Sequence, residues 1–190
     1  MDTHLLAVIV TIILITLSGT LINLLKKVRQ KDVIVVRDNG NLRLFQFIIP
    51  LSIIGAFGAY YSGWDNLDFS VFTITTGFLM VAAGLTVRWI AVLSLGNAFT
   101  VQLGIIPDHT LKTDGIYKHL RHPGYSGMLL YYFGLGMGMH NWVSILLLIA
   151  GPVIVVLNRI KMEEALLKTH FGGAYEQYML VAKKLIPMVY

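Results

Sequence analysis

The sequence contains uncharged apolar runs long enough to cross a lipid bilayer, and this restricts the possible folds more than any other feature. The first run, residues 5–25, has 21 residues without a charge. At a rise of about 1.5 Å per residue, a helix of this length crosses a hydrocarbon core of ~30 Å. Two further runs cover residues 44–63 and 69–96, and only Arg88 interrupts the second of them. Each run predicts one transmembrane helix.

The last apolar stretch, residues 125–157, is too long for a single transmembrane helix. It holds 33 residues without a charge and contains a polar break at His140 and Asn141. This pattern predicts a hairpin of two short helices. We therefore expect an all-α, polytopic membrane protein that forms one domain over residues 1–190, with five spans at about residues 5–25, 44–63, 69–96, 123–139 and 142–157.

The basic residues predict how these spans are oriented. Of 15 Lys and Arg residues, six lie in the 26–43 loop, three in the 97–122 loop and five after residue 158. The remaining connections, including 64–68, carry none. Five spans place all the basic segments on one side, which the positive-inside rule assigns to the cytoplasm. We expect the N-terminus outside and the C-terminus inside, with segments 97–125 and 158–190 cytoplasmic.

Composition excludes several functional classes. The chain is 56% hydrophobic and only 13% charged, which argues against an ordinary soluble domain. The net charge of +5 follows the flanks of the apolar runs, so it indicates contact with anionic lipid rather than with nucleic acid. The absence of cysteine excludes disulfides and thiolate chemistry, and we expect no metal site.

Three closely spaced glycines lie in the fourth predicted helix. Gly134, Gly136 and Gly138 resemble a dinucleotide-binding fingerprint only superficially, because no strand precedes them. Gly134 and Gly138 instead form a GxxxG pair in an apolar helix. Such a pair permits two helices to approach closely, so we expect a packing role here.

The loop before the hairpin carries the most informative polar residues. Pro123 suits the first position of a helix, whose free backbone N–H groups and positive dipole end favour a carboxylate or phosphate. Alternatively, Arg121 and His122 anchor this helix at the lipid headgroups, with Tyr125 in the aromatic belt. The loop by itself does not separate the two interpretations.

A second polar group follows the fifth predicted span. Arg159 and Glu163 are four residues apart on one helix face, and so are Glu164 and Lys168. One interpretation is a solvated helix with two weak ion pairs, each worth about 0.3–0.5 kcal/mol. The other is a binding site, because the hairpin returns these charges to the face where the fourth span begins. Paired charges beside an apolar surface suit a ligand with both charges and a hydrophobic tail.

Arg88 is the one charge inside a predicted span. A charge at this depth is costly unless its side chain reaches the interface or a partner, so such residues are functional candidates. Structural anchoring and substrate contact both remain open for Arg88.

Two motifs resemble blocks of a known family. Residues 115–127 resemble the G-x-Y-x-x-x-R-H-P-x-Y-x-G signature of the isoprenylcysteine carboxyl methyltransferase family. Glu163-Glu164, Phe171-Gly172 and the later Tyr175 and Tyr178 resemble its second block. The resemblance covers about the last 90 residues, from Gln102 onward. This chain is similar to a minimal, prokaryotic-type member with five spans, fewer than the family's eukaryotic members have.

The resemblance implies an integral membrane O-methyltransferase that uses S-adenosyl-L-methionine. It implies Arg159 and Glu163 as catalytic residues, with Arg159, and in our reading also Arg88, in contact with the substrate. The implied cofactor-binding residues are Gln102, His109, Thr110, Leu111, Lys112, Tyr117, Arg121, His122, Pro123, Gly124, Tyr125, Glu163 and Glu164. They imply a cofactor pocket on the cytoplasmic side and an active site there.

The expected acceptor is a lipid-linked, prenylcysteine-like carboxylate that enters from the membrane. A carboxylate is already a nucleophile, so alignment with the methyl donor supplies most of the rate. An amine acceptor, as in phospholipid methylation, needs a base, for which His122 or Glu164 are the candidates. A sterol reductase-like protein that uses NADPH and a non-enzymatic transporter are the further alternatives.

Overall fold

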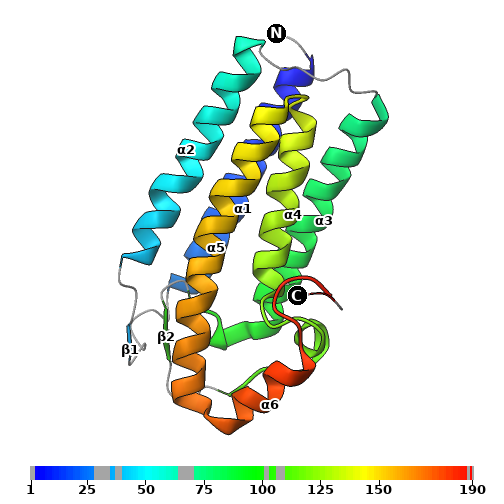
Figure 1. Cartoon of the computed structure of the whole chain (residues 1–190). Helices are drawn as coiled ribbons and strands as arrows, with labels where there is room; N and C mark the ends of the chain where they lie inside the picture. Colours follow the sequence, from blue (N-terminus) through cyan, green and yellow to red (C-terminus); the bar gives the residue numbers. More distant parts are fainter. Residues whose placement is uncertain are drawn as a thin grey trace.

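The protein is a bundle of long helices, seen in a computed structural model that describes residues 3–27, 35–36, 40–63, 71–100, 103–105, 110–187 and 189. The five long helices are α1 (Thr3–Lys27), α2 (Asn41–Ser62), α3 (Val71–Leu95), α4 (Pro123–Gly138) and α5 (Trp142–Phe171). They run alternately up and down, so the N-terminal end and the α4–α5 turn lie at one end of the bundle (Figure 1). Helices suit these apolar runs because every backbone group bonds within its own segment. The expected all-α membrane fold is confirmed.

Four of the described helices are long and apolar enough to cross a membrane. The qualifying segments are Leu5–Leu25, Leu42–Ser62, Val71–Leu95 and Trp142–Phe171. Helix α4 has 16 residues, which corresponds to about 24 Å and is short of a ~30 Å hydrocarbon core. The number of spans therefore stays a prediction. The apolar part of α5 ends at Leu157, and residues 158–171 continue the helix as a charged extension beyond the predicted span.

The predicted helical hairpin is present, and its turn has a local cause. His140 adopts a left-handed backbone conformation with φ 52°, which ends the helical path. Asn141 is the N-cap of α5, and its side chain accepts a hydrogen bond from the backbone N–H of Ser144 at 2.9 Å. At the opposite end, α4 begins at Pro123, the first helical position expected for this proline.

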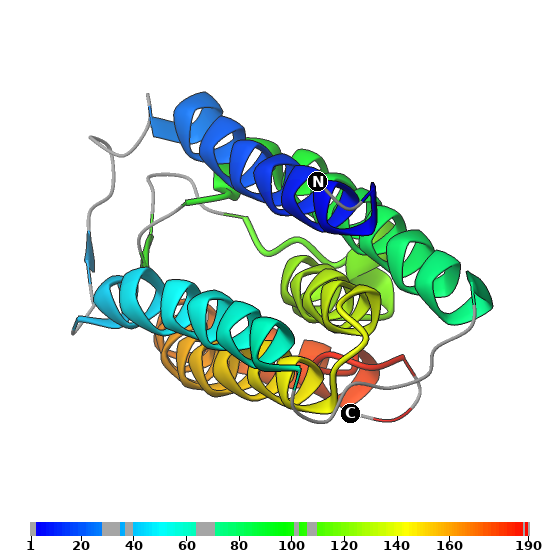
Figure 2. The same cartoon turned by 90° about the horizontal axis from the view of Figure 1, so that it is seen from above.

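The helices pack in two pairs joined by the α4–α5 hairpin. Helix α3 packs against α4, and α2 packs against α5. Helix α1 makes fewer contacts, and these are with α3 and α4. One contact with α3 is the hydrogen bond that Trp89 Nε1 donates to Ser18 Oγ at 2.8 Å. From above, α1 and α2 lie on different sides of the bundle (Figure 2).

Short elements close the end of the bundle where α4 begins. They are β1 (Val35–Val36), η2 (Gly96–Ala98), β2 (Gly104–Ile105), η3 (Gly115–Lys118) and α6 (Gly173–Val181). Strands β1 and β2 form a two-residue antiparallel ladder that pairs Val35 with Ile105. The chain after α6 returns to the start of α4, where the backbone N–H groups of Arg121 and His122 donate to the carbonyls of Lys183 and Lys184. This return fixes the first turn of α4.

The predicted outer connection at residues 64–68 lies outside the described residues.

Candidate functional site

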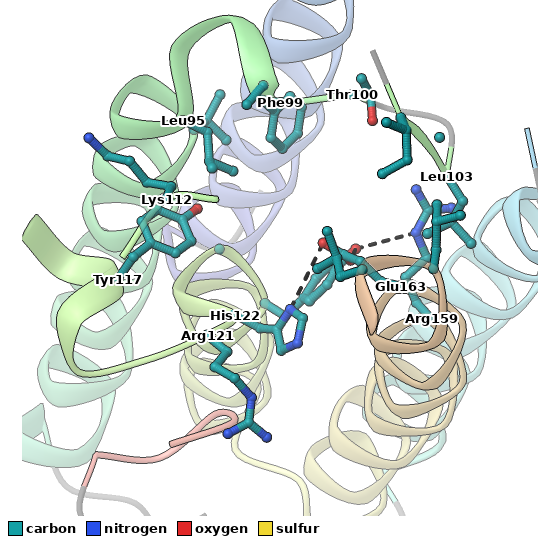
Figure 3. A pocket seen from close by; sticks show the side chains of 18 of the residues that line it. Leu95, Phe99, Thr100, Leu103, Lys112, Tyr117, Arg121, His122, Arg159 and Glu163 are labelled. Carbon is teal, nitrogen blue, oxygen red and sulfur yellow. Dashed lines mark hydrogen bonds and ion pairs between the residues drawn. The ribbon is translucent and has the colours of Figure 1, made fainter. Parts of the chain in front are cut away.

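A cavity of about 420 Å³ opens at the end of the bundle where α4 begins. Residues from every long helix, from β2 and from α6 line it. Figure 3 shows part of this lining. A volume of this size suits a small-molecule ligand. Ten of the site residues expected from the sequence lie in its wall: Arg88, Leu111, Lys112, Tyr117, Arg121, His122, Gly124, Tyr125, Arg159 and Glu163.

A chain of hydrogen bonds links α4 and α5 across this cavity. The Tyr125 hydroxyl donates to Glu163 Oε2 at 3.0 Å and accepts from Arg159 Nε at 3.3 Å. Arg159 is 5% exposed, so its charge lies within the protein rather than in solvent. Figure 3 shows Arg159 and Glu163 projecting from α5 toward the cavity. The arrangement offers a ligand an anionic and a cationic group one helical turn apart.

A second group of charges lies behind the cavity wall. Arg121 Nε lies 2.9 Å from Glu164 Oε1, and His122 Nε2 lies 3.2 Å from the same oxygen. Burial favours a raised pKa for the Glu164 carboxyl, but the hydrogen bonds from His122 and Arg121 outweigh it and lower this pKa to about 2. Glu164 is thus an anion that bonds to His122 and Arg121 rather than forming the solvated pair with Lys168.

The ionised Glu164 determines which nitrogen of His122 carries a proton. A carboxylate accepts hydrogen bonds only, so His122 Nε2 is the donor in this contact. The other nitrogen, Nδ1, lies 4.0 Å from Glu163 Oε1 (Figure 3). The ring of His122 thus lies between the carboxylates of Glu164 and Glu163, and the residue is only 4% exposed.

Arg88 reaches the same site from α3. Its Nη1 donates to the carbonyl of Gly124 at 3.3 Å, in the first turn of α4. This contact places the guanidinium at the cavity wall, where it both anchors α4 and faces the ligand space.

Tyr117 joins η3 to the bundle. Its hydroxyl donates to the carbonyl of Ala91 at 3.2 Å, and its own carbonyl accepts from Tyr178 at 2.6 Å. Burial, reinforced by the Glu163 charge, raises the pKa of Tyr117. The hydroxyl therefore stays protonated and keeps this contact with α3.

Three described residues that were expected in the site do not line the cavity. Thr110 is exposed. Pro123 is fully buried and begins α4, while Glu164 lies behind Arg121 and His122. Gln102 and His109 fall outside the described residues.

Sequence reasoning did not assign several lining residues to the site. Two tyrosines come from α6, namely Tyr175 and Tyr178, and the apolar wall includes Phe45, Val92, Leu95, Phe99, Leu103, Leu166 and Leu167. The apolar lining residues could not be recognised from the sequence, because a leucine that faces a cavity and a leucine that faces lipid occur in the same kind of apolar run. The tyrosines stood in a motif that the sequence had already marked. Among the described residues, no group of three or more His, Asp or Glu side chains is placed to hold a metal ion.

Residues 76–169 match the model of the isoprenylcysteine carboxyl methyltransferase (ICMT) family. This segment runs from α3 through most of α5 and includes the first turn of α4. It therefore contains both groups of charges at the site.

Curated proteins of several eukaryotes are similar to part of this chain. Protein-S-isoprenylcysteine O-methyltransferase of Schizosaccharomyces pombe is 38% identical over 127 residues, which is 65% of this chain and 53% of that protein. A protein of Oryza sativa subsp. indica named probable protein-S-isoprenylcysteine O-methyltransferase is 32% identical over 62% of this chain and 63% of its own length. The Mus musculus protein-S-isoprenylcysteine O-methyltransferase is 30% identical over 65% of this chain and 43% of its own length. The matches thus span about half the length of these relatives.

A solved structure has a similar fold over about three quarters of this chain. It is described as the eukaryotic intramembrane Ras methyltransferase ICMT without a monobody, and it superimposes with a TM-score of 0.63 at 25% identity. The superposition covers 76% of this chain and 52% of that chain.

Proposed function

Because this chain belongs to the isoprenylcysteine carboxyl methyltransferase family, we propose that it is a membrane O-methyltransferase that uses S-adenosylmethionine. Its substrate is a lipid-linked, prenylcysteine-like carboxylate. The observation that carries the proposal is the cavity in which Glu163, Tyr125 and Arg159 meet beside an apolar wall. The named relatives methylate isoprenylcysteine according to their names, which supports this acceptor class.

The residues present fit the methyl donor. A cavity of about 420 Å³ lies within the range for ligands of this size. Glu163 is an anion for the ammonium or the ribose hydroxyls, and the first turn of α4 at Gly124 offers a positive dipole end for the carboxylate. The bound cofactor supplies a methyl group on a sulfonium sulfur.

The opposite wall suits a lipid-linked acceptor. Arg159 is buried at the cavity and presents a planar fork of N–H donors, the geometry that binds carboxylates with two hydrogen bonds. Leu42 and Phe45 of α2 and Val92 of α3 add an apolar surface for a hydrocarbon tail. Tyr125 contacts both Arg159 and Glu163, so it links the acceptor side to the donor side.

The chain's contribution to rate is positioning and exclusion of water. A carboxylate acceptor needs no base, and the two buried charge groups hold their side chains in fixed places before any ligand arrives. The Glu164 carboxylate already bonds to Arg121 and His122, and this makes it unsuitable as a base for an amine acceptor. This favours carboxylate over amine methylation.

We assign the site to the cytoplasmic face, with the N-terminus outside and membrane lipid as the route of the acceptor. The clustering of basic residues in segments 26–43, 97–122 and 158–190 supports this orientation.

Ligand binding by the purified protein tests the cofactor assignment. The chain in detergent should bind S-adenosylhomocysteine in calorimetry, and Glu163→Gln should weaken binding by about tenfold or more, because a charged hydrogen bond is lost. Lys118→Gln, a change at an exposed lysine outside the cavity, is the matched control and should bind like the unchanged protein. Absence of binding by the unchanged protein would overturn the methyltransferase proposal.

The acceptor is tested by labelled methyl transfer. A farnesylated cysteine analogue should be methylated in vesicles, and the product should be base-labile, as an ester is. Arg159→Lys should raise KM for this acceptor with little change in S-adenosylhomocysteine affinity, because only the planar fork is lost. Methyl transfer to phosphatidylethanolamine, and not to the farnesylated cysteine analogue, would instead support phospholipid methylation.

A further inference from the structure

Tyr175 carries a buried hydroxyl that has no hydrogen-bond partner in the structure. The residue lies in α6, is 1% exposed and lines the cavity described above. Its hydroxyl oxygen is shielded from solvent and bonds to no protein group. None of the site assignments made so far uses this side chain.

An unpaired buried hydroxyl is unfavourable, because the group has lost its water and gained nothing in return. The neighbouring Tyr178 shows the usual outcome, since its hydroxyl donates to the carbonyl of Tyr117 at 2.6 Å. The two rings are near neighbours on one helix, with centroids 6.0 Å apart. The difference between them is that the Tyr175 hydroxyl has no hydrogen-bond partner within the protein, although both side chains line the cavity.

The electrostatic surroundings of Tyr175 keep it protonated. Burial is the main cause of a raised pKa for this hydroxyl, and the charges of Glu164 and Glu163 raise the pKa further. At neutral pH the group can therefore both donate and accept a hydrogen bond. Tyr175 and Glu163 both line the cavity.

We propose that the Tyr175 hydroxyl binds a polar group of the S-adenosyl ligand, next to the group that Glu163 binds. Ligand binding then satisfies a hydroxyl that the free protein leaves unpaired. Tyr175 is a ligand-binding residue that the sequence motif alone marks only as an aromatic position. This inference rests on the proposed function, because it takes the S-adenosyl compound as the ligand of this cavity.

The test compares two tyrosine-to-phenylalanine variants of the full chain in detergent. Tyr175→Phe should leave the melting temperature without ligand equal to or above that of the unchanged protein, because it removes an unpaired polar group. The same variant should bind S-adenosylhomocysteine about tenfold more weakly in calorimetry. Tyr178→Phe is the matched control, and it should lower the melting temperature because its hydroxyl donates within the protein.

Titration with adenosine alone identifies the ligand group. If Tyr175→Phe also binds adenosine about tenfold more weakly than the unchanged protein does, the hydroxyl contacts the nucleoside. If only the affinity for S-adenosylhomocysteine falls, the hydroxyl contacts the amino-acid end of the ligand. Unchanged S-adenosylhomocysteine affinity in Tyr175→Phe would overturn the inference while leaving the proposed function intact. If the unchanged protein bound no S-adenosyl compound, both would be overturned.

Discussion

At the scale of single residues, Arg121 joins three separate parts of the chain. Its guanidinium pairs with Glu164 of α5 and donates to the carbonyls of Met179 and Ala182 at the end of α6. Every one of these contacts lies outside the ligand space, although the Arg121 side chain also borders the cavity. Arg121 and Glu164 therefore act as positioning residues for His122, and the resemblance-based assignment of both as cofactor ligands stays a prediction.

Loss of the Glu164 charge is expected to destabilise the fold. Glu164→Gln leaves the Arg121 guanidinium, whose side chain is 8% exposed, without an anion, at a cost of about 3 kcal/mol. Thermal unfolding in detergent should show a clearly lower melting temperature. Asp114→Asn removes the partner of an exposed ion pair with Lys112 and should leave the melting temperature unchanged. Equal effects of the two substitutions would contradict the positioning role.

The same carboxylate predicts a dependence of stability on acidic pH. The pKa of Glu164 is about 2 in the folded protein against an ordinary 4.5, so its stabilisation is complete above about pH 4.5. It is lost as the pH falls from there toward 2, because the carboxyl of the unfolded state takes up a proton in this range while that of the folded state stays ionised. The difference in melting temperature between the unchanged protein and Glu164→Gln should therefore shrink over this range. A difference that stays constant down to pH 2.5 would rule out Glu164 as its source.

At the scale of elements, the α3–α4 interface fixes where the site begins. A methyl group built on Gly84 would lie 2.6 Å from the carbonyl oxygen of Gly127 and 2.6 Å from the backbone nitrogen of Tyr131. Gly134 is in similar contact with Gly77, about two helical turns along. A methyl group on Gly138, by contrast, would meet only the ring of Phe78 at 3.7 Å. The close approach thus depends on Gly127 and Gly134, two helical turns apart, more than on Gly138, the second glycine of the GxxxG pair.

Filling this interface should separate the two helices. Gly84→Ala places a methyl group against backbone atoms that cannot rotate away, at a cost of about 1–3 kcal/mol. The change should lower the melting temperature and also weaken S-adenosylhomocysteine binding, because α4 carries His122 and Tyr125. Gly58→Ala in α2 is the control, since nothing lies within 4 Å of its added methyl group, and it should be neutral or stabilising. A stable Gly84→Ala protein would show that the interface can relax.

At the scale of the whole molecule, the alternating helices gather the polar segments at one end. The loop before α4, the charged extension of α5 and α6 meet there, while the α4–α5 turn lies at the opposite end (Figure 1). The charged residues and tyrosines of the site thus come from residues 88–178, which are brought together because the hairpin reverses the chain. We interpret the site end as cytoplasmic from the distribution of basic residues.

Orientation can be measured by cysteine labelling, because the natural chain has no cysteine of its own. Ser62→Cys lies at the end of α2 opposite the site, and Lys118→Cys lies in η3 beside the site. In intact cells an impermeant maleimide should label Ser62→Cys, and it should label Lys118→Cys only after the membrane is permeabilised. The reverse pattern would invert the proposed orientation.

The sequence by itself determined the helices, the hairpin and much of the candidate site. Uncharged runs specify helices because backbone groups in hydrocarbon must bond within their own segment. Pro123 and the polar His140–Asn141 break marked helix ends through local chemistry that needs no distant partner. Tyr125 and Glu163 belong to the two motif blocks, and Arg159 lies one helical turn before Glu163. Their meeting in one cavity therefore followed from the hairpin.

Only the tertiary structure decided which side chains face the cavity and which charges pair. Helices that are apolar on all sides carry no periodic signal to separate the ligand-facing wall from the lipid-facing surface, so Phe45 and Val92 were not predicted. Glu164 bonds to Arg121, 43 residues away, instead of to Lys168 one turn along its own helix. The unpaired hydroxyl of Tyr175 likewise exists only because folding buries it. Burial, contact and pairing between distant segments are properties of the packed chain, and local sequence does not encode them.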